Sequence, residues 1–199
     1  MQAGMAGGST DAASFINAMN KLFDLKMTED EINVVGKEIG ADVVPCLYNI
    51  PVKAEGIGDI VTKLDTKLKY YIIVIKPDIS CDTKYMYQRI DMAKDLKQND
   101  FTEKIIEGME KSNLKLMSSG MYNVFESVIE QKEKIETIKN DFIKLGAVNS
   151  LMTGSGSCVY GIFETKNEVK KAYEILKKKY KEIYMCNSFV HKNDWKKYN

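Results

Sequence analysis

The chain has 199 residues, of which 44% are hydrophobic and 29% are charged, a balance that is ordinary for a globular protein of one domain or two small ones. Because the formal net charge is only +1, the sequence shows no overall attraction to nucleic acid or to an acidic membrane surface, and we expect neither as a partner. The longest apolar run, residues 70–75, is too short to span a bilayer, and no secretory signal is recognisable, so we expect a cytoplasmic protein.

The cysteines and the histidine give little support for a metal site. Cys46, Cys81, Cys158 and Cys186 lie far apart, without a Cys-x-x-Cys pair, and His191 is the only histidine. A zinc site needs several such ligands at close spacing. We therefore expect free and mostly buried thiols in a reducing compartment, and we predict no metal-ligating residues.

The chain is organised around its first dozen residues, where a glycine-rich turn runs into a helix predicted over about residues 9–25. Gly4, Gly7 and Gly8 lack a Cβ atom, so the backbone there can take positive φ angles and a ligand can approach the amides closely. Ser9 then stands where the helix begins. The start of a helix has unpaired N–H groups and a partial positive charge, and both favour a bound phosphate.

Other interpretations of this turn have to be weighed beside a phosphate site. A glycine cluster before a helix is more often only a tight turn, so the turn and the phosphate interpretations both stay open. A P-loop is excluded because no lysine follows the glycines. A dinucleotide-binding fingerprint also fits poorly, because it needs a strand before the glycines and only residues 1–3 precede them here.

A second helix is predicted after the first. Residues 28–31, Thr-Glu-Asp-Glu, form a capping box, in which the first and last side chains bond each other's exposed backbone N–H groups. Ile32, Val35 and Ile39 make the apolar stripe of this helix. Gly40 is expected to end it in the left-handed conformation that commonly closes a helix.

One carboxylate, Asp42, stands among the small and apolar residues 41–46. A carboxylate in such surroundings would be partly desolvated unless it is paired or lies at the mouth of a site, so Asp42 is a candidate for chemistry. The alternative is an aspartate that caps a helix or forms a turn. The local sequence leaves both possibilities open.

The middle of the chain shows a turn over residues 54–59, a short strand over 60–62 and a charged linker over 63–69. Residues 70–75 are rich in β-branched and aromatic side chains and stop before Pro77, so they predict a buried strand at which a new domain starts. The remaining elements are expected as helices over 82–90 and 100–111, one long or two shorter helices between 122 and 145, strands over 148–152, 158–163 and 183–190, and a helix with Val169, Tyr173 and Leu176 on its inner face.

Residues 153–157, Thr-Gly-Ser-Gly-Ser, form a second small-residue loop between two predicted strands. Such a loop is either a flexible hairpin or a place where another segment or a ligand comes close. The lysines on the helix before the last strand are expected to form a solvated face, and the tail over residues 191–199 to be loosely held. The order of the elements predicts an α+β layer, in which helices cover one face of an antiparallel sheet.

Three segments of the sequence occur in the order seen in the GHMP small-molecule kinases: residues 2–13, residues 40–43 with the Ala-Glu-Gly-Ile-Gly of residues 54–58, and residues 152–157. The resemblance covers most of the chain up to about Phe189. The Ala-Glu-Gly-Ile-Gly segment and residues 123–128 resemble the members that phosphorylate a cytidine-linked sugar alcohol more than those that act on homoserine or mevalonate.

This resemblance implies an α+β fold with the C-terminal part of a GHMP nucleotide-binding (ribosomal S5 domain 2-like) domain over residues 1–66 and a ferredoxin-like C-terminal domain over residues 67–199. It also implies ATP and Mg²⁺ as cofactors and a small-molecule substrate. Asp42 matches the catalytic aspartate, which accepts or orients the proton of the attacking hydroxyl. The ATP phosphates would be held by the backbone amides of Met1, Gln2, Ala3, Gly4, Met5, Ala6, Gly7, Gly8, Ser9 and Thr10, and the third-motif loop would be Gly154, Ser155, Gly156 and Ser157.

The sequence departs from the family pattern in two places. Members open with a strand-rich stretch that contains a catalytic lysine, and no such stretch precedes the first glycine segment of this chain. Residues 43–53 also differ, because Asn49-Ile50-Pro51 replaces a glycine turn. Positioning supplies most of the rate in phosphoryl transfer, so we expect weak or absent turnover from these residues alone. The alternative functions are a non-catalytic nucleotide-binding remnant and another GHMP kinase.

Overall fold

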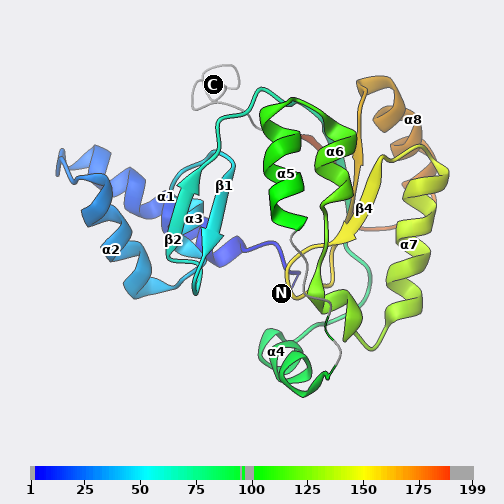
Figure 1. Cartoon of the computed structure of the whole chain (residues 1–199), viewed down its shortest axis with the longest axis horizontal. Helices are drawn as coiled ribbons and strands as arrows, with labels where there is room; N and C mark the ends of the chain where they lie inside the picture. Colours follow the sequence, from blue (N-terminus) through cyan, green and yellow to red (C-terminus); the bar gives the residue numbers. More distant parts are fainter. Residues whose placement is uncertain (1–2, 95, 97–100, 189–199) are drawn as a thin grey trace. The chain divides into compact units, whose positions relative to one another are not determined.

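The computed structural model describes residues 3–94, 96 and 101–188 (Figure 1). The described residues form two compact units, which we call the helical unit, residues 6–66, and the sheet unit, residues 3–5 and 67–188. The tail predicted over residues 191–199 lies outside the described residues. No helix in the described ranges has the length and the apolar character needed to cross a bilayer.

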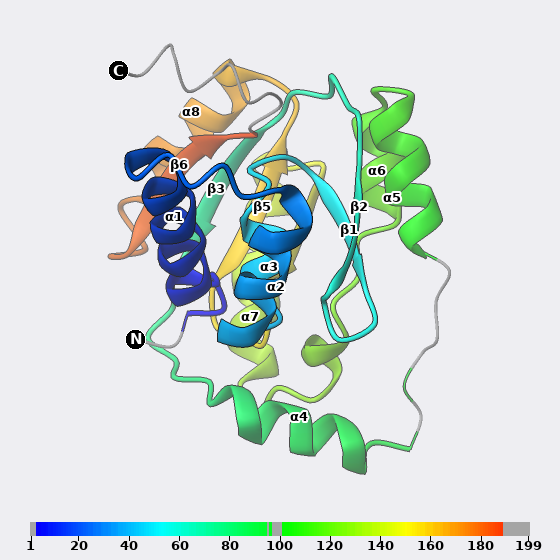
Figure 2. The ribbon, with the colours of Figure 1, turned by 90° about the vertical axis from the view of Figure 1, so that its left-hand side faces the viewer.

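The helical unit contains three helices and one hairpin: α1 (Gly7–Leu22), α2 (Glu29–Ile39), α3 (Val43–Cys46), β1 (Val52–Glu55) and β2 (Ile60–Lys63). Figure 2 shows α1 beside α2 and α3. The strands β1 and β2 pair antiparallel, with Val52 opposite Lys63. The predicted turn and the strand over residues 60–62 are therefore part of a hairpin, and its first strand, β1, was not predicted.

The helix α2 begins as predicted. The Thr28 hydroxyl accepts the Glu31 N–H at 3.3 Å, and the Thr28 N–H donates to the Glu31 carboxylate at 2.7 Å, so both halves of the capping box are present. The helix ends at Gly40, but the predicted left-handed conformation is wrong, since its φ of 170° is extended backbone.

The apolar stripe predicted for α2 is only partly correct. Ile32 and Val35 pack against the core of the helical unit, whereas Ile39 is 58% exposed. The buried position is Gly36, where a Cβ would lie 2.9 Å from the Leu47 side chain. A glycine therefore marks the close contact with the segment that follows, which a search for apolar spacing does not detect.

The sheet unit is built on a four-stranded antiparallel sheet in the order β4-β5-β3-β6. Its strands are β3 (Tyr71–Ile75), β4 (Asn149–Met152), β5 (Val159–Phe163) and β6 (Ile183–Asn187), close to the predicted ranges; residues 189–190 of the last prediction are not described. One face packs on α7 (Lys132–Lys144) and α8 (Lys166–Leu176). Phe142 of α7 lies over Gly161 of β5, where a Cβ would be 2.6 Å from the ring.

The opposite face of the sheet is partly covered by α5 (Phe101–Glu110) and α6 (Leu114–Ser119), as Figure 1 shows. The expectation that helices cover only one face is therefore wrong. Its physical reason is that β3 and β5 are apolar on both faces, since Ile72 and Ile162 point away from α7 and pack in the cluster with Leu114 and Met117. The short helix α6 was not predicted.

The helices around the sheet otherwise follow the predictions. α4 (Thr83–Met92) and α5 agree with the predicted helices, and α8 buries Val169 and Leu176. The region between residues 122 and 145 contains a 3₁₀ helix, η1 (Val124–Ser127), followed by α7. This corresponds to the second of the two alternatives, with a first helix much shorter than expected.

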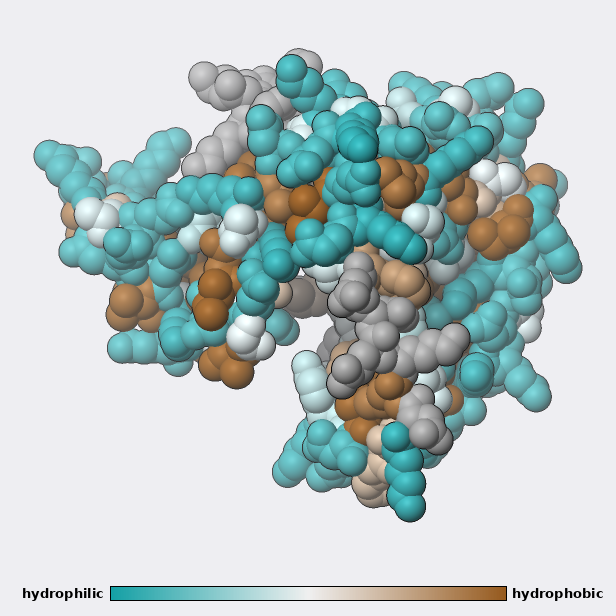
Figure 3. All heavy atoms as spheres, viewed as in Figure 1, coloured by the Kyte–Doolittle hydropathy of each residue, from teal (hydrophilic) through white to brown (hydrophobic). Residues whose placement is uncertain are grey.

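Large apolar side chains remain on the surface of the helical unit (Figure 3). Those more than half exposed are Phe15, Leu22, Phe23, Leu25, Val34, Ile39, Ile57 and Ile60. The buried core of this unit consists of only six residues, among them Ala13, Ile16 and Leu47.

Candidate active site

The helix α1 begins at Gly7, two residues earlier than predicted, because the Thr10 N–H donates to the Ala6 carbonyl at 2.9 Å. Gly7 and Gly8 are therefore helical residues and do not use the positive φ angles that glycine allows. The residues with positive φ are Gly4, at 68°, and Ala6, at 49°. Of the other predicted phosphate-binding residues, Met1 and Gln2 lie outside the described residues.

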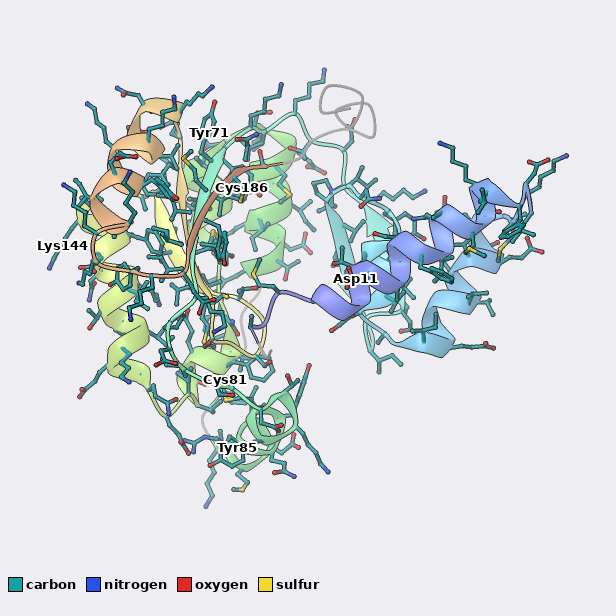
Figure 4. All side chains as sticks on the ribbon, turned by 180° about the vertical axis from the view of Figure 1, so that it is seen from behind. Asp11, Tyr71, Cys81, Tyr85, Lys144 and Cys186 are labelled. Carbon is teal, nitrogen blue, oxygen red and sulfur yellow. The ribbon has the colours of Figure 1, made fainter. Side chains whose placement is uncertain are left out.

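The N-terminus of α1 is left open to a ligand. No side chain caps it, and its first turn contains no acidic residue; Asp11, labelled in Figure 4, comes after that turn and is exposed. The N–H groups of the first helical residues therefore have no partner within the helix. A Cβ built on Gly7 or Gly8 would meet nothing within 4 Å, so neither glycine is required for packing. Open space above free amides is what a bound phosphate would need.

Asp42 stands immediately before α3, and its side chain makes no cap hydrogen bond. The Asp42 side chain is exposed, so its apolar neighbours in the sequence do not remove it from solvent. Val43 and Val44, which follow it, are almost completely buried and fix the backbone of this segment. The result is a carboxylate on a firmly held backbone, without a hydrogen bond or ion pair to the part of the chain that the structure describes.

The helices α1 and α3 pack against each other within the helical unit. The Thr10 hydroxyl donates to the Ala6 carbonyl at 3.0 Å and lies 3.7 Å from the Cys46 sulfur, at the end of α3. One small unit therefore contains both the open helix N-terminus and the unpaired Asp42 carboxylate.

In the sheet unit, residues 3–5 contact the loop over residues 153–157. This loop is therefore a place where another segment comes close, which was one of its two predicted interpretations. The Thr153 hydroxyl donates to the Gly4 carbonyl at 2.8 Å, and the Cys158 N–H donates to the Ala3 carbonyl at 3.2 Å. A Cβ on Gly4 would lie 2.2 Å from the Thr153 carbonyl oxygen, and one on Gly154 would lie 2.9 Å from the Gly4 oxygen. Glycine is thus required on both sides of this contact.

The same loop is anchored on its other side by the segment before α4. Ser157 is fully buried, and its hydroxyl donates to the Ile79 carbonyl at 2.6 Å, while the Ser155 and Thr83 hydroxyls lie 2.9 Å apart. A Cβ on Gly156 would be 3.1 Å from the sulfur of Cys81, which Figure 4 labels. The loop connects β4 to β5, so it is both a hairpin connection and a place of close approach.

All four cysteines are free thiols, as expected, but fewer are buried than predicted. Cys81 and Cys158 are buried, Cys46 is partly buried and Cys186 is exposed. Burial raises the pKa of the Cys81 and Cys158 thiols, which keeps both protonated near neutral pH. The described residues contain no group of three or more acidic, cysteine or histidine side chains that could hold a metal ion.

Asn123 and Glu126, for which no role was predicted, lie against the start of the 153–157 loop. The Asn123 amide donates to the Met152 and Gly154 carbonyls, at 2.7 and 2.9 Å. The Glu126 carboxylate accepts the Met152 N–H at 2.6 Å. The signal in the sequence was the family resemblance of residues 123–128, which did not indicate a contact with this loop.

Comparisons with known proteins agree with this arrangement of segments. A model described as the GHMP kinases N terminal domain matches residues 1–49, and one described as GHMP kinases C terminal matches residues 92–182. The chain is 35% identical, over 186 residues, to the 4-diphosphocytidyl-2-C-methyl-D-erythritol kinase of Clostridium tetani. That match covers 93% of this chain and 66% of the relative.

Solved structures show the same fold. A crystal structure of 4-(cytidine 5'-diphospho)-2C-methyl-D-erythritol kinase superposes with a TM-score of 0.74 at 23% identity, covering 94% of this chain and 66% of that one. Homoserine kinase from Cytophaga hutchinsonii gives a TM-score of 0.75 at 18% identity, covering 96% and 67%. The chain thus spans about two thirds of the length of these proteins. Two models of one family, matched in chain order over most of the sequence, together with this relative, show that the chain belongs to the GHMP kinases.

Proposed function

We propose that this chain takes part in transferring the γ-phosphoryl group of ATP to a hydroxyl of a small molecule, with 4-diphosphocytidyl-2-C-methyl-D-erythritol as the substrate. The observation that supports this most is the open, uncapped N-terminus of α1 in the same unit as the unpaired carboxylate of Asp42. In this proposal residues 1–66 belong to the nucleotide-binding domain, and residues 67–199 form the C-terminal domain.

The proposed mechanism uses backbone amides in place of a P-loop lysine. The N–H groups at Gly7 and Gly8 would face the phosphate oxygens and stabilise their negative charge. The substrate oxygen would attack the γ-phosphorus, so that a new O–P bond forms, the bond to the β-phosphate oxygen breaks and ADP leaves. Asp42 would orient the hydroxyl and accept its proton, a role that needs a carboxylate without a competing partner.

Magnesium enters this proposal only with the nucleotide. The described residues do not supply a cluster of side chains that could bind the ion by themselves. In kinase sites Mg²⁺ is bound chiefly by substrate phosphates and water, so we treat it as part of the substrate and assign no step to it.

The choice of substrate depends on sequence similarity and not on the fold. The superpositions on the cytidyl-substrate kinase and on homoserine kinase have nearly equal TM-scores, 0.74 and 0.75. The 35% identity to the Clostridium tetani protein favours the cytidine-linked sugar alcohol. The second candidate function is nucleotide binding without turnover, which a direct assay of ADP release from the purified chain separates from catalysis.

The phosphate interpretation is tested by Gly7→Ala and Gly8→Ala. Both positions are helical and open, so we expect stability to change by less than about 0.5 kcal/mol, or to rise. A methyl group above the amides should weaken ATP binding about tenfold or more, since it holds the phosphates away from their hydrogen-bond donors. Titration calorimetry with ATP measures this.

Adenosine, which has no phosphates, serves as the ligand control, and Lys21→Ala at the other end of α1 serves as the variant control. Gly7→Ala and Gly8→Ala should bind adenosine like the parent, and Lys21→Ala should bind ATP like the parent. Unchanged ATP affinity in both glycine variants would rule out the proposed cradle.

The role of Asp42 is tested separately with Asp42→Asn, which keeps the shape of the side chain and removes its charge. If the chain releases ADP in the presence of substrate, this variant should lose about 100-fold or more of kcat while ATP affinity changes little. Equal turnover of the two proteins would remove Asp42 from the mechanism.

A further inference from the structure

Two polar side chains of residues 123–127, those of Asn123 and Glu126, hydrogen-bond the end of β4 and the loop that follows it. Asn123 precedes η1, and its side-chain oxygen accepts the Phe125 N–H at 3.0 Å, which fixes the orientation of the amide. Both N–H groups of that amide then have carbonyl partners, Met152 at 2.7 Å and Gly154 at 2.9 Å. A side-chain amide has two donor hydrogens, so its donors are fully used.

Glu126 binds the same strand end as a hydrogen-bond acceptor, whereas Asn123 binds it as a donor. One carboxylate oxygen accepts the Met152 N–H at 2.6 Å, and the other accepts the Lys139 ammonium at 2.6 Å. Both side chains of this ion pair are less than a fifth exposed. Burial alone would lower the pKa of Lys139, but the hydrogen bond and charge of Glu126 outweigh it and the pKa is raised, so Lys139 is charged at neutral pH.

This strand end lies at the edge of the sheet. β4 is the outer strand, and Met152 is its last residue, so the N–H and the carbonyl of Met152 have no neighbouring strand on that side. Asn123 and Glu126 satisfy both groups. Their third contact, with the Gly154 carbonyl, lies beyond the strand and inside the loop. A segment that served only to cover the edge would have no need of that contact.

From this strand end, hydrogen bonds lead directly to the first glycine segment. Thr153 lies between the two residues held by Asn123, and its hydroxyl donates to the Gly4 carbonyl at 2.8 Å. The two backbones are in close contact, because a Cβ on Gly4 would lie 2.2 Å from the Thr153 carbonyl oxygen. Gly4 precedes Gly7, the first residue of α1, by three residues in the sequence.

We infer that Asn123 and Glu126 are positioning residues, which fix residues 153–154 and, through Thr153, the backbone of Gly4, and which thereby set the affinity for the nucleotide phosphates. The part that concerns the nucleotide rests on the proposed function. The positioning of residues 153–154 by Asn123 and Glu126 does not depend on that function.

The test uses the full chain with Asn123→Asp and Glu126→Gln. Asn123→Asp keeps the acceptor for the Phe125 N–H but replaces two donors by a carboxylate that faces two carbonyl oxygens. Glu126→Gln is the milder change, since it keeps an acceptor for the Met152 N–H and loses the charge that pairs with Lys139. If Asn123→Asp does not fold, Glu126→Gln still decides the question.

Matched controls come from the same unit. Asn113 accepts the Leu116 N–H at the start of α6, and Asp141 pairs with Lys179; neither side chain has a hydrogen bond to residues 152–157. Asn113→Asp and Asp141→Asn therefore repeat the two chemical changes away from the loop. Unfolding midpoints show whether control and test variants are destabilised to similar extents.

Two readouts are measured, amide hydrogen exchange at residues 153–158 and the dissociation constant for ATP. We expect Asn123→Asp to speed exchange in this loop about tenfold or more and to raise the ATP dissociation constant about tenfold, because it loses two hydrogen bonds. Glu126→Gln should change both quantities about threefold, because it loses only the charged pair with Lys139. The controls should leave both readouts unchanged. Loop exchange that stays the same in both test variants, or rises equally in the controls, would overturn the inference.

A double-mutant cycle with Thr153→Val tests the route to Gly4. If positioning acts through Thr153, the effects of Asn123→Asp and Thr153→Val on exchange at residues 3–5 should not add, whereas those of Asn113→Asp and Thr153→Val should. Thr153→Ser keeps the hydroxyl and should behave like the parent. A parent chain that binds no ATP would contradict the proposed function, and the exchange measurements would still decide whether Asn123 and Glu126 position the loop.

Discussion

The helical unit and the sheet unit hold their candidate site segments in different ways. The sheet unit fixes residues 153–157 with hydrogen bonds from several directions, over a continuous core of eighteen buried residues. The helical unit fixes the start of α1 and Asp42 on a core of six. Small cores leave little surplus over the conformational entropy lost on folding, so we expect the helical unit to open more readily.

This difference separates glycines with the same sequence signature. Gly4 and Gly154, in the sheet unit, are required because backbone lies where their Cβ atoms would be. At Gly7 and Gly8, in the helical unit, an added Cβ would meet nothing within 4 Å. Gly4 and Gly154 are therefore needed for packing, whereas Gly7 and Gly8 leave open space at the start of α1. Variants of these residues and of the two cores can break or sharpen the comparison.

The largest effect is expected at Phe142, the fully buried ring over Gly161 that also packs edge-on against Phe163. Phe142→Ala should destabilise the sheet unit by about 4 kcal/mol, since it loses the burial of a ring and leaves a cavity. Urea unfolding followed by near-ultraviolet circular dichroism measures the change. Ile143→Ala, at the half-exposed next residue, should cost less than about 1 kcal/mol; similar losses in both would show that the core is not packed as described.

Gly4→Ala comes next. An alanine there would need a positive φ of 68° and would overlap the Thr153 carbonyl, and together these should cost about 3 kcal/mol or detach residues 3–5 from the loop. Hydrogen exchange at residues 153–158 distinguishes the two outcomes. Gly7→Ala is the matched control, with no expected loss. A neutral Gly4→Ala would mean that the contact between the two glycine loops is not tight.

The sequence predicted local structure better than it predicted the contacts that hold each segment in place. The glycines, the capping box at Thr28 and the buried strand at residues 71–75 depend on local rules, so they could be found without the fold. The left-handed residue Ala6 could not, because alanine carries no preference for that conformation. Asp42 is exposed although Val43 and Val44, which follow it, are buried, so apolar neighbours in the sequence did not show how the carboxylate is placed.

The least predictable features were contacts between distant segments. Gly4 and Thr153 are separated by 149 residues, and the local sequence of neither segment indicates a contact with the other. Residues 123–128 were singled out only for their family resemblance, and the hydrogen bonds of Asn123 and Glu126 could not be predicted, because the backbone groups that they satisfy belong to a strand edge. The second covered face of the sheet was missed for the same reason, since an apolar strand does not reveal which helices will reach it.

Leu47 tests the weaker core. It is buried in the helical unit and packs where α2 has Gly36. Leu47→Ala should cost about 2 kcal/mol, at the low end for a buried leucine because a small core can partly collapse into the space. Exchange should accelerate at the amides of residues 7–63 and stay unchanged in β3 and β5. Acceleration in both units would show that they unfold together.

The smallest effect is expected on the exposed apolar surface of the helical unit. Phe15 is 65% exposed, although its neighbour Ile16 is buried, so Phe15→Ser removes an aromatic ring that has little to pack against. Surface substitutions of this kind change stability by less than about 0.5 kcal/mol, whereas Ile16→Ala on the same helix should cost several times more. Chemical denaturation of the two variants gives the ratio. A cost above about 1 kcal/mol for Phe15→Ser would mean that the ring is covered in solution, and the helical unit would then be better packed than its six buried residues indicate.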